Sequence, residues 1–137
     1  MRSHFELTDE LFEEQFRNCT LDAAIFNHEA HLRLAWVHIS KYGTVQAIEN
    51  ICLQLTAYTN SLGAGSKYNK TLTIAAISAV NHFMNKTAAS NFSDFITEFP
   101  RLKNNFRELM AQHYHVDIFS SESAKKEYLE PDLLPFS

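Results

Sequence analysis

Glycine and proline are scarce in this sequence, with three of each among 137 residues. Both residues break regular structure, so a chain with so few of them has few enforced turns and many positions that favour helix. No alternation of apolar and polar residues runs far enough to build a sheet. These absences predict an all-α fold, a single-domain antiparallel helical bundle with a short extended C-terminal strap. We expect one domain over residues 1–137, with the core bundle at about 8–115 and the strap at about 120–137.

Other absences narrow the classes of protein. No apolar run approaches the roughly 18 residues of a membrane span, and the acidic, amphipathic start lacks the apolar core of a secretory signal. From these two absences we expect no membrane partner and a cytoplasmic location. The net charge is −4 and there is no basic stripe, so we also expect no nucleic-acid partner. The two cysteines, Cys19 and Cys52, match no metal-ligand spacing and are expected to be reduced, packed thiols.

Capping residues and apolar spacing set the expected helix boundaries. The predicted helices are 9–18, 28–42, 45–62 and 69–85, followed by shorter helical segments between Ser90 and Pro100, at 101–114, and early in the tail. The expected N-caps are Thr8, Asn27, Thr44 and Ser90. The expected inward residues are Leu11, Phe12 and Phe16 in the first helix, and Ala47, Ile48, Ile51, Leu55 and Tyr58 in the third.

The second helix starts with two histidines one turn apart, in "FNHEAHLRLAW". Helical periodicity places His28 in the core-facing stripe and His31 on its shoulder, with Arg33 and Val37 on the opposite face. Burial of an imidazole without a partner costs about 1–3 kcal/mol, so an inward histidine needs a partner or a use. Three interpretations stay open: a hydrogen-bonded core histidine, a metal ligand, or part of a catalytic or ligand-binding pair.

A divalent metal is the cofactor that this pair would suit. Histidines at positions i and i+3 reach one ion from the same helix face, and helical bundles hold such sites in their cores. Two ligands do not complete a site, and the candidates for the others are Glu49, His82, Glu130 and Asp132. The fourth helix adds a stripe of small and polar residues that we interpret as solvent-facing: Tyr68, Thr71, Ala75, Ser78 and His82.

Three segments together, "FNHEAHLRLAW", "GSKYNKTLT" and "EPDLLP", resemble those of a widespread family of small, uncharacterised bacterial helical proteins. The resemblance covers about residues 26–135 and implies an all-helical domain without an established activity. It singles out these positions: His28, His31, Leu32, Ala35, Trp36, Lys67, Tyr68, Thr71, Thr73, Glu130, Pro131 and Asp132. The sequence departs from the family pattern at Asn69, where histidine is usual. An amide is a poor ligand for zinc or iron, so a three-histidine metal site is in doubt here.

The terminal "EPDL" is typical of a stiff, extended segment, because its proline fixes the backbone. Such a strap is expected to dock on the helices and to bring Glu130 or Asp132 over the histidines, where a carboxylate would raise the pKa of an imidazole.

The sequence leaves three hypotheses about function. The first is a small-molecule-binding protein whose polar pocket is lined by His28, His31, Trp36, Tyr68, Asn69, Thr71 and Asp132, with enzyme activity left open. The second is a metal-binding protein or metal-dependent enzyme that uses His28 and His31. The third is a protein-interaction module in which these residues stabilise the core. The oligomeric state is left open, a homodimer included.

Overall fold

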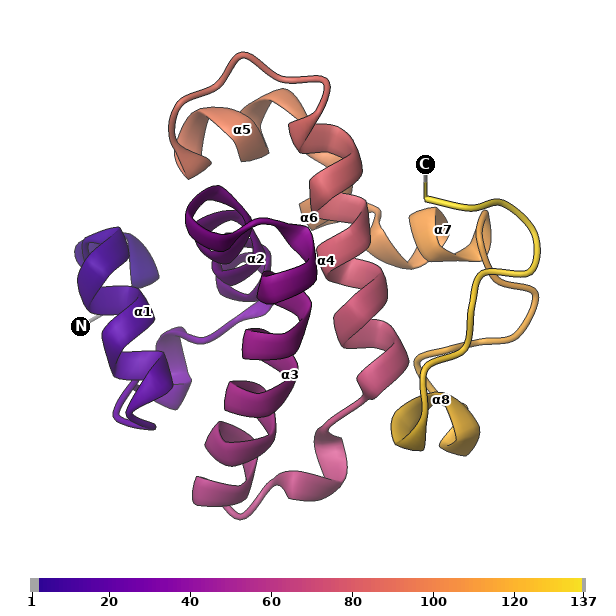
Figure 1. Cartoon of the computed structure of the whole chain (residues 1–137), viewed down its shortest axis with the longest axis horizontal. Helices are drawn as coiled ribbons and strands as arrows, with labels where there is room; N and C mark the ends of the chain where they lie inside the picture. The colour runs from indigo at the N-terminus through magenta and orange to yellow at the C-terminus, as the bar shows by residue number, and fades with distance from the viewer. Residues whose placement is uncertain (1–2, 137) are drawn as a thin grey trace. The chain divides into compact units, whose positions relative to one another are not determined.

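The structure is a computed structural model that describes residues 3–136, and over that range every regular element is helical. The predicted all-α class is therefore confirmed. The α-helices are α1 Asp9–Arg17, α2 His28–Tyr42, α3 Thr44–Ser61, α4 Lys70–Met84, α5 Phe92–Glu98, α6 Arg101–Asn104, α7 Phe106–Ala111 and α8 Glu122–Lys126 (Figure 1). Short 3-10 turns lie at His4–Glu6, Ala23–Ile25 and Gly65–Lys67. Within the described range, no helix combines the length and the apolarity needed to cross a membrane.

Contacts group the chain into two compact units, which meet in sequence between Tyr68 and Asn69. The first unit holds α1, α2 and α3, and the second holds α4 to α8 together with the C-terminal segment. Each unit is described by itself. The expectation of a single domain stays a prediction, because a division by contacts does not say whether either part folds alone.

In the first unit, α2 and α3 form a helical hairpin whose connection is the single residue Gly43. Gly43 has a φ of +82°, a left-handed value that favours glycine. An aromatic cluster fills the centre, where the ring of Phe16 lies 5.2 Å from those of Phe26 and Tyr58. The Tyr58 hydroxyl donates to the carbonyl oxygen of Leu21 at 2.8 Å. This bond joins α3 to the loop after α1.

The burial of α2 differs from the predicted single stripe. Nearly every residue from Ala30 to His38 is buried, and the set includes Arg33 and Val37, which periodicity places outside. His28, predicted to face the core, is exposed. A helix covered on several sides has no polar face, so apolar spacing alone cannot orient it. In α3 the prediction is largely confirmed, since Ala47, Ile51, Leu55 and Tyr58 are all buried.

Helix caps are confirmed at Thr8 and Asn27, whose side chains accept hydrogen bonds from the first turns of α1 and α2. Two predicted caps are wrong. Gly43, not Thr44, precedes α3, because the hairpin leaves no residue between the two helices for a capping side chain. Asn91 caps α5 in place of Ser90. Leu11, predicted to be buried, is 44% exposed. Both cysteines are free, as expected, but they are only half-buried.

In the second unit, α4 packs against α8, and the chain after α8 runs back in an extended conformation (Figure 1). We call residues 127–136 the strap. The main chain of Leu133 donates to the carbonyl oxygen of His113 at 3.0 Å, so the strap lies against the segment that follows α7. An extended C-terminal strap is therefore present and docked within this unit, whereas the predicted approach of Glu130 or Asp132 to His28 and His31 stays a prediction.

Candidate functional site

The histidine pair predicted from the sequence lies at the start of α2. Both His28 and His31 are exposed, and the ring of His31 stacks on that of Phe26 with centroids 4.0 Å apart. Removal of water from the packed face of the ring lowers the pKa of His31, and the nearby His28 lowers it further. The residue remains in contact with water at its other edge. His31 is therefore a mainly neutral, surface-stacked imidazole near neutral pH.

Trp36 and Tyr68 belong to the same unit. Trp36 is 7% exposed in the middle of α2, which makes it part of the core. Tyr68 is half-buried at the end of the first unit. Burial raises the pKa of Tyr68, and Cys52 raises it further, so the phenol stays protonated.

Asn69 and Thr71 join distant parts of the second unit. The Asn69 side chain caps α4 by accepting from the Leu72 N–H at 2.9 Å, and its amide donates to the carbonyl oxygen of Ile118 at 2.7 Å. The Thr71 hydroxyl donates to the carbonyl oxygen of Glu127 at 2.7 Å and accepts from the Leu129 N–H at 2.9 Å. Thr71 is fully buried, so its interpretation as solvent-facing is wrong.

Asp132 lies on the strap. Its carboxylate accepts a hydrogen bond from the main-chain N–H of His115 at 2.9 Å. The docked strap thus brings this carboxylate to the backbone of a histidine that follows α7. The candidate residues of the sequence-based pocket divide between the units, with Asn69, Thr71 and Asp132 in the second. Within residues 3–136, no three His, Cys, Asp or Glu side chains are grouped so that they could hold a metal ion.

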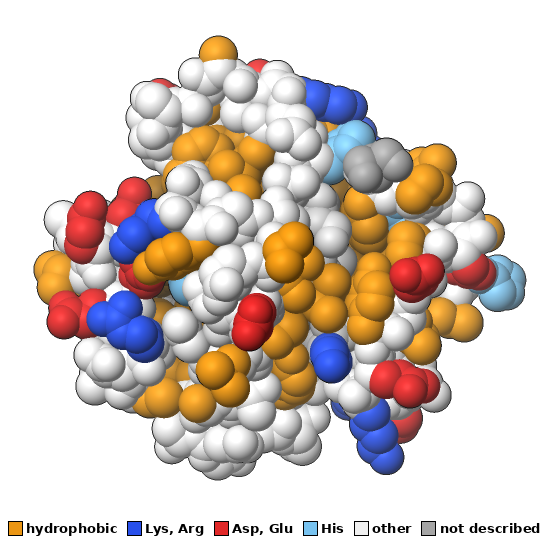
Figure 2. Space-filling model, in the orientation of Figure 1, with side chains coloured by type: hydrophobic (Ala, Val, Ile, Leu, Met, Phe, Trp, Pro, Cys, Tyr) orange, Lys and Arg blue, Asp and Glu red, His pale blue; other side chains and the backbone are white. Residues whose placement is uncertain are grey.

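A pocket of about 340 Å³ lies in the second unit between α4, α6, α7 and the end of the strap. We call it the strap pocket. Its lining residues are Ala79, His82, Phe83, Lys86, Arg101, Leu109, Gln112, His113, Leu134, Pro135 and Phe136. Side chains of Lys or Arg and of His lie together near the C-terminal end of α4 in Figure 2. None of the seven candidate residues from the sequence lines this pocket.

His113 fixes the strap where it forms the pocket wall. Its ring stacks on Phe136 with centroids 4.1 Å apart, and its Nδ1 lies 2.7 Å from the carbonyl oxygen of Leu134. A carbonyl oxygen only accepts, so Nδ1 carries the proton and donates this bond. Nε2 is then the polar atom that His113 can offer to a ligand.

The charge of the strap pocket has one sign. Lys86 and Arg101 line it, and no Asp or Glu is among its described lining residues. Neither basic side chain takes part in an ion pair within residues 3–136. The Lys86 ammonium lies 5.9 Å from the centre of the Phe83 ring. The pocket therefore combines two basic groups with an apolar wall.

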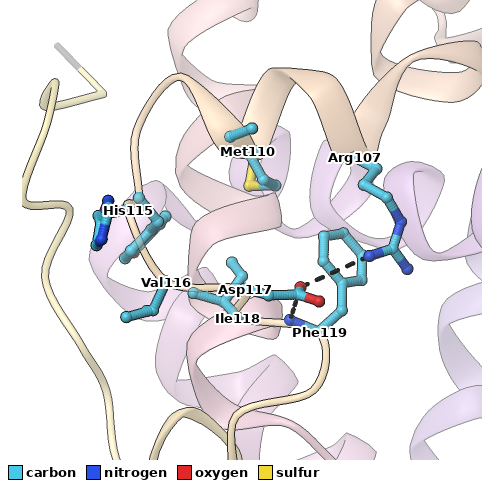
Figure 3. A pocket seen from close by; sticks show the side chains of 9 residues that line it. Arg107, Met110, His115, Val116, Asp117, Ile118 and Phe119 are labelled. Carbon is cyan, nitrogen blue, oxygen red and sulfur yellow. Dashed lines mark hydrogen bonds and ion pairs between the residues drawn. The ribbon is translucent and has the colours of Figure 1, made fainter.

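A second pocket, of about 290 Å³, lies around the segment after α7 (Figure 3). Its charged groups already satisfy one another. The Arg107 guanidinium lies 3.6 Å from Asp117 and 4.1 Å from the centre of the Phe119 ring, and Asp117 accepts from the Phe119 N–H at 3.0 Å. Because these groups have partners within the unit, this pocket has less to offer a charged ligand than the strap pocket.

The first unit contains a buried polar cluster that the sequence reasoning missed. Glu13, 3% exposed, accepts hydrogen bonds from Lys41 and Tyr42 at 2.5 Å each. Burial raises the pKa of Glu13, but the bonds from Lys41 and Tyr42 outweigh it, so the net shift is downward. His38 is fully buried nearby, and neither ring nitrogen has a hydrogen-bond partner. Burial lowers the pKa of His38 and keeps it neutral.

No protein-family model, curated protein or solved structure matches this chain.

Proposed function

We propose that this protein binds a small molecule in the strap pocket. The observation that carries the proposal is a concavity whose wall is completed by a chain segment fixed in place. The volume of about 340 Å³ lies at the lower end of the range for ligand sites, so it suits a compact molecule. A lining of several aromatic and aliphatic residues with a few polar groups is typical of such sites.

Preorganisation supports the proposal. The strap that forms one wall is held by the hydroxyl of Thr71, by Nδ1 of His113 and by the hydroxyl of Tyr114, which donates to the carbonyl oxygen of Leu129 at 2.9 Å. A wall that is already ordered costs a ligand less entropy on binding than a wall that must order around it.

A thermal-shift screen of small metabolites tests the proposal. A ligand that binds only the folded protein stabilises it by about 2.7 kcal/mol at a concentration of 100 times its Kd. We expect at least one compound to raise the melting temperature of the unaltered protein. Gln112→Trp places a bulky ring at the pocket from an exposed position, and it is expected to abolish that rise.

Gln46→Trp is the matched control, because Gln46 is an exposed glutamine on α3 of the first unit. It should leave the ligand-induced rise intact. The proposal fails if no compound stabilises the protein, or if Gln112→Trp responds to the compounds as Gln46→Trp does.

A further inference from the structure

We propose that the ligand of the strap pocket is a carboxylic acid with a compact apolar body, bound as its monoanion. This inference rests on the proposed function and adds the chemical class of the ligand. It starts from the mismatch inside the pocket, where the basic groups have no acidic partner and most of the remaining lining is apolar.

The charges favour an anion. Lys86 and Arg101 come from different elements, one just after α4 and the other at the first position of α6, and both line the same pocket. Both side chains are exposed, so they are hydrated when no ligand is present. An arginine guanidinium matches the two oxygens of a carboxylate with two parallel hydrogen bonds, and a lysine ammonium adds a mobile positive charge. A cation would be repelled by both.

The apolar wall favours a ligand with a hydrocarbon or aromatic body. Phe83 and Leu109 contribute from the helices, and Leu134 and Phe136 contribute from the strap. A small inorganic anion would leave this wall facing water, and the burial of apolar surface contributes about 25 cal/mol for each Å². The volume of the pocket limits that body to a short chain or a single ring.

The exposure of the basic groups favours a carboxylate over a phosphate ester. A phosphate ester carries close to two negative charges near neutral pH, and their removal from water costs more than the removal of one. Lys86 and Arg101 are exposed and pair weakly with an anion, so they offset the smaller cost of a carboxylate more readily. His113 adds no donor for the anion, because its Nδ1 proton is committed to the carbonyl oxygen of Leu134 and Nε2 of a neutral imidazole only accepts. Its ring stacks on Phe136, so the contribution of His113 is to fix the wall that the strap forms.

The test compares three probes that share one skeleton: 4-phenylbutyrate, 4-phenylbutanol and 4-phenylbutylammonium. Their binding is measured by calorimetry near neutral pH and low salt. We expect the acid to bind about tenfold tighter than the alcohol, and the ammonium to bind weakest. Lys86→Met and Arg101→Gln should each weaken the binding of the acid by about fivefold and leave the binding of the alcohol unchanged.

Lys70→Met is the control, because Lys70 is an exposed lysine at the start of α4 that does not line the pocket. Circular dichroism checks that every variant keeps its helical content. Binding of the acid that persists in Gln112→Trp overturns the inference, as does the absence of measurable acid binding. Equal binding of acid and alcohol, unaffected at Lys86 and Arg101, also overturns it. In that last case the proposed function still stands, because a small molecule occupies the pocket without need of a charge.

Discussion

In the first unit, a buried arginine holds the N-terminal segment, whereas in the second unit hydroxyl and imidazole groups hold the main chain of the strap. Arg33 donates to the carbonyl oxygens of His4 at 2.6 Å and Leu7 at 2.8 Å, and it pairs with Asp9 at 2.8 Å. The strap instead receives its bonds from Thr71, His113 and Tyr114. Acidic and basic side chains gather over α1 in Figure 2.

The difference has a physical consequence for how each segment responds to its surroundings. Bonds to a charged group are roughly twice as strong as neutral ones, but a charge that loses its partners inside the protein carries a large desolvation cost. The N-terminal segment of the first unit is therefore strongly held as long as Arg33 is present. The strap is held by several bonds from side chains to its main chain, and a single substitution can remove each of these bonds.

The largest expected effect is at Arg33. The Arg33 guanidinium lies 4.9 Å from the centre of the Phe12 ring. Arg33→Met keeps the apolar stem of the side chain and removes its hydrogen-bond donors. The buried carbonyl oxygen of Leu7 then loses its partner, at about 1–3 kcal/mol. The bonds of Arg33 to Asp9 and to the carbonyl oxygen of His4 are lost as well, although the latter keeps the Leu7 N–H. Urea denaturation followed by circular dichroism measures the loss in the free energy of unfolding.

Arg107→Met is the matched control from the second unit. Arg107 and its partner Asp117 are both exposed, so the loss is expected to stay below about 1 kcal/mol. If Arg33→Met lowers the free energy of unfolding no more than Arg107→Met does, the bonds of Arg33 do not hold the N-terminal segment.

Arg33 also shows where sequence reasoning stops. The caps at Thr8 and Asn27 were predictable because the side chain bonds to a backbone group three residues away. The partners of Arg33 lie 24 to 29 residues away, so no local spacing indicates that the residue is buried. Its position opposite the apparent apolar stripe predicted the reverse.

The same limit applies to the candidate site. The fourth helix and the cap at its start follow from local signals, but the roles of Asn69 and Thr71 depend on strap and loop residues 49 to 58 positions later. Similarly, Lys86 and Arg101 belong to one pocket only because the chain turns back through α5. Their shared charge could be read from the sequence, but their shared location could not.

An intermediate effect is expected at Thr71. Thr71→Val preserves the shape of the side chain and removes the hydroxyl that serves both the carbonyl oxygen of Glu127 and the N–H of Leu129. The expected loss is about 1–3 kcal/mol, with faster hydrogen exchange along the strap, because two main-chain groups lose one shared partner.

Thr73→Val is the control from the same helix. The Thr73 hydroxyl donates to the carbonyl oxygen of Asn69, which also accepts from the Thr73 main-chain N–H, so little is lost with the hydroxyl. Equal stability of the two variants, with unchanged exchange at Leu129, would show that Thr71 does not hold the strap.

The smallest expected effect is the response of the first unit to acid through His38. The groups that act on its charge are Glu13, Lys41 and Arg17. Burial lowers the pKa of His38 below the ordinary value of about 6.5, so on acidification the unfolded chain binds a proton before the folded chain does. Stability should therefore fall as the pH drops below about 6.5, by at most about 1.4 kcal/mol per pH unit for this one proton.

His38→Leu removes the titrating group and two buried nitrogens that have no partner. Thermal melts between about pH 7.5 and 5.5 should show a shallower decline for this variant than for the unaltered protein. The pKa of His31 is lowered too, so adding His31→Leu should flatten the decline of stability with falling pH further. The Glu13 carboxylate, whose pKa lies below 4.5, stays ionised throughout this range and does not obscure the comparison. An unchanged slope in the double variant would mean that the acid response of the protein arises from groups other than His31 and His38.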